Sequence, residues 1–194
     1  QIAETLDQFA NHPGDWQGFL SWFSELPLFI EKPEFRVVHA CWDHDLINQY
    51  TRDTGKNTVD MDFIHASVDQ SSFAGRMMDR LTRGTDMALP DGRSMTSKDG
   101  YTRQFFRTRF WGDTPTTYGE VAFQPDPLPE DIANRPISAE NRQRICSYHV
   151  DERPLFVGHY WLDQSPRPLA PNVACLDYSA VKYGRLAAYR MDGE

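Results

Sequence analysis

The chain has 194 residues and a formal charge of −8, and 40% of its residues are hydrophobic and 13% aromatic. This length favours a single domain, while the aromatic content excludes a disordered chain. The acidic charge argues against a nucleic-acid partner, and no apolar run reaches the roughly 20 residues that a membrane helix needs. Half of the cations lie within residues 51–110, so the sequence is compatible with a small anionic ligand.

The N-terminal part of the chain is expected to form two helices, two strands and a third helix. Apolar residues recur at helical spacing before and after a break at residues 11–13, and Pro27 ends the second helix. Two short strands follow at 28–31 and 34–40, and Asp43 is placed to cap a helix that reaches Tyr50.

The remaining sequence predicts further helices and strands around a long excursion. A helical region is expected over 61–83 and an extended segment over 101–111. Residues 112–140 are rich in Pro, Asp and Glu, which is typical of a surface excursion. Strands are expected at 154–158, 173–178 and 185–190, the last two as a hairpin. Together these elements predict an α/β fold, with a mixed β-sheet and flanking helices.

Two of the predicted strands end in a histidine. His39 follows the apolar pair Val37–Val38, and His159 follows a strand that ends at Gly158. Ligands of α/β folds gather at the carboxyl ends of strands, and imidazole is a common metal ligand. The two histidines are therefore candidates for one metal centre, although each also fits the role of a satisfied polar residue at a strand end.

Three segments occur in order along the chain, VVHAC, FVGHYW and NVACLDYSAVKYGRLAAYR. This order resembles the C-terminal half of calcineurin-like metallophosphoesterases, above all the bacterial group near phosphoprotein phosphatases and diadenosine tetraphosphatases. The stretch 89–111 also resembles an insert of that group. The resemblance implies that 1–194 is a single or partial domain, the C-terminal half of an αββα sandwich, with a subgroup-specific insert over 52–150.

The same resemblance implies an enzyme that hydrolyses phosphate esters with two divalent metal ions, Mn, Fe or Zn. Such ions clamp the phosphate and activate a water for in-line attack. His39 and His159 would both bind the second metal. The implied substrate is a phosphorylated small molecule, a dinucleoside polyphosphate or a phosphoprotein, and no nucleic acid or membrane is expected as a partner.

The chain departs from the family in its other ligand motifs. GDxH, GDxxDRG and GNHE are absent, and neither Gly14-Asp15 nor Gly112-Asp113 is followed by the required residues. We therefore expect a C-terminal half that is inactive alone and holds one metal or none. Apolar surface around Trp16, Phe19 and Phe23 should then be exposed unless the missing half or a second copy covers it.

Weaker candidates leave alternatives open. Three arginines, Arg103, Arg107 and Arg109, fall on the same face of the predicted extended segment. They could form either a clamp for a substrate phosphate or a solvent-exposed strand face. Asp177 either supports a metal-binding histidine or caps a turn.

Other functions and the cellular compartment are also considered. A non-catalytic fragment or regulatory partner is one alternative, and a single-metal enzyme that adds Asp43 or Asp177 to the two histidines is another. Three widely spaced cysteines, Cys41, Cys146 and Cys175, form no disulfide framework and indicate a reducing cytoplasm.

Overall fold

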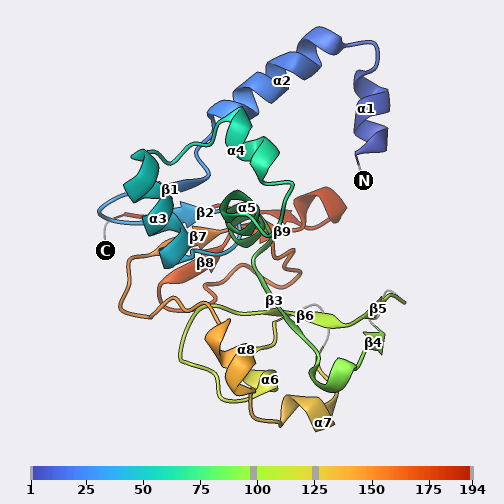
Figure 1. Ribbon diagram of the computed structural model, residues 1–194, viewed down its shortest axis with the longest axis vertical. Helices are drawn as coiled ribbons and strands as arrows, with labels where there is room; N and C mark the ends of the chain where they lie inside the picture. The colour runs from blue at the N-terminus through green and yellow to red at the C-terminus, as the bar shows by residue number, and fades with distance from the viewer. Residues whose placement is uncertain (1, 97–99, 124–126, 193–194) are drawn as a thin grey trace.

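A computed structural model describes residues 2–96, 100–123 and 127–192. A four-stranded mixed sheet with the order β1-β2-β7-β8 lies at its centre (Figure 1). The strands are β1 (Phe29–Glu31), β2 (Arg36–Val38), β7 (Leu155–Val157) and β8 (Val173–Cys175). β1 runs antiparallel to β2, whereas β2, β7 and β8 run parallel. The carboxyl ends of these three strands therefore meet at one edge of the sheet.

Two helices, α3 (His44–Thr54) and α5 (Phe73–Arg83), contribute to the main core beside the sheet. Asp43 begins α3 by accepting a hydrogen bond from the Leu46 N–H at 3.2 Å, and Gly55 ends it with a φ of 68°. Side chains of the sheet and the two helices meet in this core, among them Phe29, Val38, Ile47, Tyr50, Met77, Leu81, Leu155, Val157 and Val173. The predicted α/β class, with a mixed sheet and helices, is thus confirmed.

The sheet also presents an apolar surface that is only partly covered. Ile30, Val37 and Phe156 are partly buried, and they help to line a hollow of about 280 Å³. Tyr189 from the C-terminal segment packs on Phe156, with 5.1 Å between the ring centroids. Alternation along the strands places these three side chains opposite the inward-facing Phe29, Val38 and Leu155.

A second, smaller core lies outside the sheet. β3 (Thr85–Ala88) pairs antiparallel with β6 (Phe105–Thr108), and both pack with α6 (Tyr118–Val121) and α7 (Glu130–Ala133). This core comprises Met87, Leu89, Phe106, Tyr118, Val121, Leu128, Ile132 and Ile137. In Figure 1 these elements form a lobe below the sheet, together with β4 (Met95–Thr96), β5 (Thr102–Arg103) and α8 (Ala139–Gln143). The predicted insert 52–150 contains this lobe as well as α5, which packs on the sheet.

The two N-terminal helices, α1 (Ala3–Phe9) and α2 (Pro13–Glu25), extend away from the sheet (Figure 1). Phe9 packs on Trp16 with 5.3 Å between ring centroids, yet neither helix contains a buried residue. Phe19 is 45% exposed and Phe23 is 54% exposed. The apolar surface expected here is therefore exposed at Phe19 and Phe23, whereas Trp16 is partly buried.

The predicted helical region 61–83 is interrupted. It forms α4 (Met61–Ala66) and α5, separated by a turn in which the Asp69 carboxylate accepts hydrogen bonds from the backbone and hydroxyl of Ser71. Ser72 then caps α5 by accepting from the Gly75 N–H at 2.9 Å. Short polar side chains that bind nearby backbone groups compete with a helix, which explains the break.

The C-terminal strands are shorter than predicted. β9 (Asp177–Tyr178) pairs with β10 (Arg185–Leu186). The turn between the two strands contains a 3-10 turn, η2 (Ala180–Lys182), and its flanking residues Ser179 and Tyr183 have positive φ. Another 3-10 turn, η1 (Pro90–Gly92), follows β3. Within the described ranges, no helix has both the length and the apolar character to cross a membrane.

Candidate functional site

His39 and His159 lie side by side at the carboxyl edge of the sheet. Each follows one of two neighbouring parallel strands, β2 and β7, so the strand pairing brings them together. The Gly158 N–H donates to the His39 carbonyl at 2.9 Å, and the two imidazole centroids are 5.5 Å apart. His39 is exposed and His159 is partly buried. Two residues 120 positions apart in sequence thus form one pair.

The backbone at this loop is strained at the histidine rather than at the glycine. A Cβ on Gly158 would meet its nearest neighbour, the His39 carbonyl, at an ordinary 3.6 Å, so close approach does not require glycine here. His159, in contrast, has a φ of 68°, which few residues with side chains adopt. Strain of this kind persists only where the surrounding structure imposes it.

The surroundings of His159 keep its imidazole neutral. Burial, the charge of Arg107 and the neighbouring His39 lower the pKa of His159 from 6.5 to about 4, and Asp177 opposes this shift. The Arg83 backbone also opposes the lowering of the His159 pKa. A histidine that is neutral at pH 7 retains a lone pair, which is the form that binds a metal ion.

The three predicted arginines have different surroundings. Arg107 on β6 lies opposite Asp86 in the strand register, and its guanidinium carbon is 5.6 Å from the centroid of the Tyr160 ring. Burial lowers the pKa of Arg107, and the nearby charge of Arg103 adds to that effect. Arg109 instead donates from Nε to the Glu120 carbonyl at 2.6 Å. The charge of Arg107 acts on His159.

Asp177 holds the backbone of the histidine loop. Its carboxylate accepts hydrogen bonds from the Trp161 N–H at 3.4 Å and from the Ser179 N–H at 3.1 Å. Trp161 has a φ of 52° and Ser179 a φ of 58°, so the carboxylate stabilises two unusual backbone conformations. This arrangement combines turn capping with support of the loop that carries His159.

Asp43 and its neighbours are engaged elsewhere. Asp43 caps α3 and pairs with Arg80 at 3.5 Å, while His44 Nε2 lies 2.7 Å from Glu152 Oε2. For the single-metal alternative, Asp177 is therefore the better placed carboxylate, because it acts electrostatically on His159.

Tyr160 is a residue of the site that sequence reasoning missed. It is fully buried, and its hydroxyl donates to the Ala40 carbonyl at 3.1 Å. Burial raises its pKa well above the usual range, so it stays a neutral phenol. Its ring contacts both Arg107 and His159, which places it between the two. Its position directly after the strand-end histidine was the only signal in the sequence.

The donor set fits a metal ion in part. Two imidazoles, one of them held neutral, are suitable ligands for Mn, Fe or Zn. Within the described part of the chain, no group of three or more His, Cys, Asp or Glu side chains is placed to hold a metal. The pair therefore supplies part of a ligand set. Comparison with protein-family models, curated proteins and solved structures finds no match to this chain.

Proposed function

We propose that this chain is part of a calcineurin-like metallophosphoesterase that hydrolyses phosphate esters by a two-metal mechanism. The observation that carries the proposal is the pair of imidazoles, 5.5 Å apart, at the carboxyl edge of neighbouring parallel strands. This is where ligands bind in open α/β sheets. The order of the three sequence segments that resemble this family supports the same function.

In this proposal His39 and His159 bind one of the two metals. When bound, the metals polarise the phosphate and lower the pKa of a water. The chain contributes by presenting His159 as a neutral ligand, and Asp177 keeps the loop that carries it in place. Neutral imidazole is available at pH 7 without a competing proton.

Arg107 is proposed to bind the substrate phosphate. Its charge lies close enough to His159 to lower the pKa of that imidazole, and its guanidinium contacts the face of the Tyr160 ring. Arginine binds phosphate oxygens with two parallel N–H bonds, and partial burial strengthens such a bond. The substrate is a phosphorylated small molecule, a dinucleoside polyphosphate or a phosphoprotein.

The remaining ligands are proposed to come from a part of the protein that carries GDxH, GDxxDRG and GNHE motifs. In an αββα sandwich that part would cover the apolar sheet surface formed by Ile30, Val37 and Phe156. We further propose a cytoplasmic location, because the three cysteines are free thiols. The uncovered apolar surface also supports a second candidate, a non-catalytic partner that retains half of the fold.

Metal titration of this chain tests the role of the two histidines. Calorimetry with Mn²⁺ and Zn²⁺ should detect binding that falls at least tenfold in His39→Ala and in His159→Ala, as expected when one of two protein ligands is lost. His65→Ala, on the exposed face of α4, is the matched control. Equal affinity in all four proteins would contradict the proposed metal site.

A longer protein tests the activity. Extended upstream in its reading frame to include the three motifs, it should hydrolyse p-nitrophenyl phosphate with Mn²⁺ and lose activity with a chelator. Arg107→Met should raise KM, while His159→Ala should abolish turnover. If no such motifs lie upstream, the phosphoesterase proposal fails and the non-catalytic partner is favoured.

A further inference from the structure

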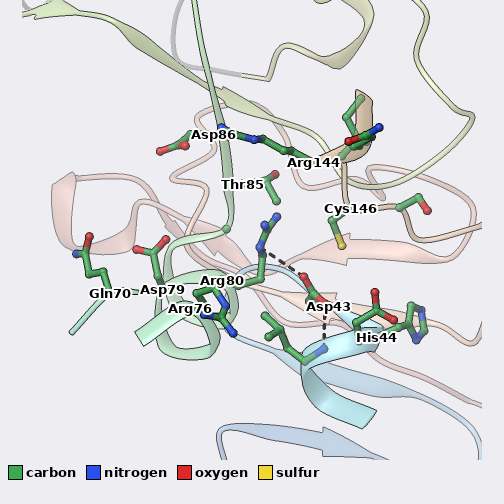
Figure 2. Close-up of a pocket in the computed structure, with 16 residues that line it drawn as sticks. Asp43, His44, Gln70, Arg76, Asp79, Arg80, Thr85, Asp86, Arg144 and Cys146 are labelled. Carbon is green, nitrogen blue, oxygen red and sulfur yellow. Dashed lines mark hydrogen bonds and ion pairs between the residues drawn. The ribbon is translucent and has the colours of Figure 1, made fainter. Parts of the chain in front are cut away.

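A polar cleft lies where the sheet core meets the second lobe (Figure 2). It has a volume of about 720 Å³ and is lined by the start of α3, by α5, by the start of β3 and by the segment that follows α8. His39, His159 and Arg107 are not among the described residues that line it. Because ligands often bind between packed units of a protein, this cleft is a second candidate site, separate from the histidine pair.

Arg80 offers hydrogen-bond donors to this cleft. Its side chain is only 27% exposed, and its Nε lies 3.5 Å from Asp43 Oδ2. Within the part of the chain that the structure describes, this ion pair is the one polar contact of the Arg80 side chain. Figure 2 shows the terminal nitrogens of Arg80 turned away from Asp43 and into the cleft. A partly buried guanidinium with donors to spare is well suited to bind an anion.

Two more arginines line the same cleft. Arg76 lies one turn before Arg80 on α5, and Arg144 reaches in from the segment after α8. Arg76 donates to the Ser71 carbonyl at 2.5 Å, whereas Arg144 is 72% exposed, with its Nη2 3.2 Å from Glu140 Oε1. Like charges four residues apart destabilise a helix. An anion bound between Arg80 and Arg144 would offset this repulsion.

Hydrogen-bond acceptors line the cleft beside the arginines. Gln70, Asp79 and Asp86 lie on one side of it in Figure 2, and Gln143 also belongs to the lining. Asp79 is 51% exposed and pairs with Arg83 at 3.4 Å. Carboxylates and amides accept hydrogen bonds from hydroxyl groups, and the carboxylates repel further negative charge. The lining therefore favours a ligand with one anionic group and several hydroxyls, and it disfavours a polyanion or an apolar molecule.

We propose that this cleft binds a small phosphorylated polyol, such as a sugar monophosphate. Arg80 and Arg144 bind the phosphate from two walls, because arginine forms parallel N–H bonds to phosphate oxygens and a phosphate monoester carries about −1.5 to −2 charge at pH 7. Asp79, Asp86 and Gln70 accept hydrogen bonds from the hydroxyls. The volume of the cleft also lies within the range of about 300–1,000 Å³ that is usual for small-molecule sites.

This site needs neither a metal ion nor the histidine pair, so it stands apart from the proposed hydrolytic function. The test is therefore a calorimetric titration of the full chain in a chelator. Ribose 5-phosphate, glucose 6-phosphate and glycerol 3-phosphate are the probes, and at least one should bind saturably, more tightly than inorganic phosphate or the same polyol without its phosphate. Failure of all three to bind, or equal affinity for inorganic phosphate, would overturn the proposal.

Substitution of the two arginines tests the phosphate contacts. Arg144→Ala should weaken binding by at least about tenfold, because charge-assisted hydrogen bonds are lost. Arg52→Ala on α3 is the matched control, since Arg52 is 73% exposed and is not among the residues that line the cleft. Arg80→Lys keeps a cation beside Asp43 but lacks the planar fork, so it should also weaken binding. Equal affinity in Arg144→Ala and Arg52→Ala would contradict the proposed contacts.

A further variant separates this cleft from the proposed hydrolytic site. Arg107→Met should bind the sugar phosphate as the wild-type chain does, because Arg107 does not line the cleft. Loss of binding in Arg107→Met, together with unchanged binding in Arg144→Ala, would place the ligand at the histidine pair and overturn the proposal. Failure of His39 and His159 to bind a metal would leave the expected titration in chelator unchanged, so the two proposals fail independently.

Discussion

Replacement of His159 with Asn isolates the electrostatics of the candidate site. Asparagine tolerates the left-handed backbone, with a φ of 68°, that this position requires. The substitution removes the imidazole, whose pKa is lowered to about 4 by burial, by Arg107 and by His39. It therefore removes one titrating group with little disturbance of the loop.

The sign of the effect follows from proton binding. In the unfolded chain the imidazole has its usual pKa of about 6.5 and takes up a proton as the pH falls. In the folded chain it stays neutral until about pH 4. The unfolded state therefore binds more protons in this window, and the wild-type chain loses stability as the pH falls from 6.5 towards 4.

The loss of stability depends on how far the pKa of His159 is lowered and on how exposed its imidazole is. The full lowering of the pKa would remove about 2 kcal/mol of stability between pH 7 and pH 5. Because His159 is only partly buried, solvent screens part of the electrostatic effect, and we expect a loss of about 1 kcal/mol of stability. His159→Asn lacks this loss, so the stability difference between the two proteins should change by that amount.

Urea unfolding at a series of pH values, followed by tryptophan fluorescence in a chelator, measures the difference. His65→Asn, the same substitution at an exposed position of α4, shows how much of the change follows from loss of any imidazole. A difference between wild type and His159→Asn that is constant from pH 7 to pH 4.5 would refute the reasoning. Titration of the His159 ring by NMR gives an independent check.

Two further pairs of substitutions test the packing. Gly75→Ala should lower the free energy of unfolding by more than about 1 kcal/mol, because the added Cβ would lie 2.1 Å from the Asp69 carbonyl oxygen. Gly18→Ala in α2 has open space around the added Cβ and should raise the free energy of unfolding by up to about 1 kcal/mol. A similar shift of the thermal midpoint in both variants would contradict this reasoning. Leu81→Ala should lower the free energy of unfolding in urea by about 2–5 kcal/mol, because Leu81 is fully buried. Val68→Ala, at a position that is 84% exposed, should change it by no more than about 0.5 kcal/mol. Equal losses in the two variants would argue against the assigned core.

Several elements could be predicted from the sequence because their signals are local. The cap at Asp43 and the two strand-end histidines are apparent in short stretches, and they appear where expected. The break between α4 and α5 also has a local cause, the turn around Asp69 and Ser72, yet the apolar periodicity obscured it. Short-range rules were wrong for residues 112–140, which were predicted as a surface excursion but form α6 and α7 and contribute to the second core.

Only the tertiary structure decided which side chains share the site. Three arginines of equal parity looked alike, but burial and strand pairing bring Arg107 towards His159, while Arg109 binds a backbone carbonyl. The hydrogen bond of the Cys146 thiol to the Trp42 carbonyl likewise arises from the packing of segments distant in sequence. Sequence spacing by itself determined several of the elements and the two strand-end histidines. Long-range packing decided the neighbours, because burial and electrostatics both depend on distances that no local pattern contains.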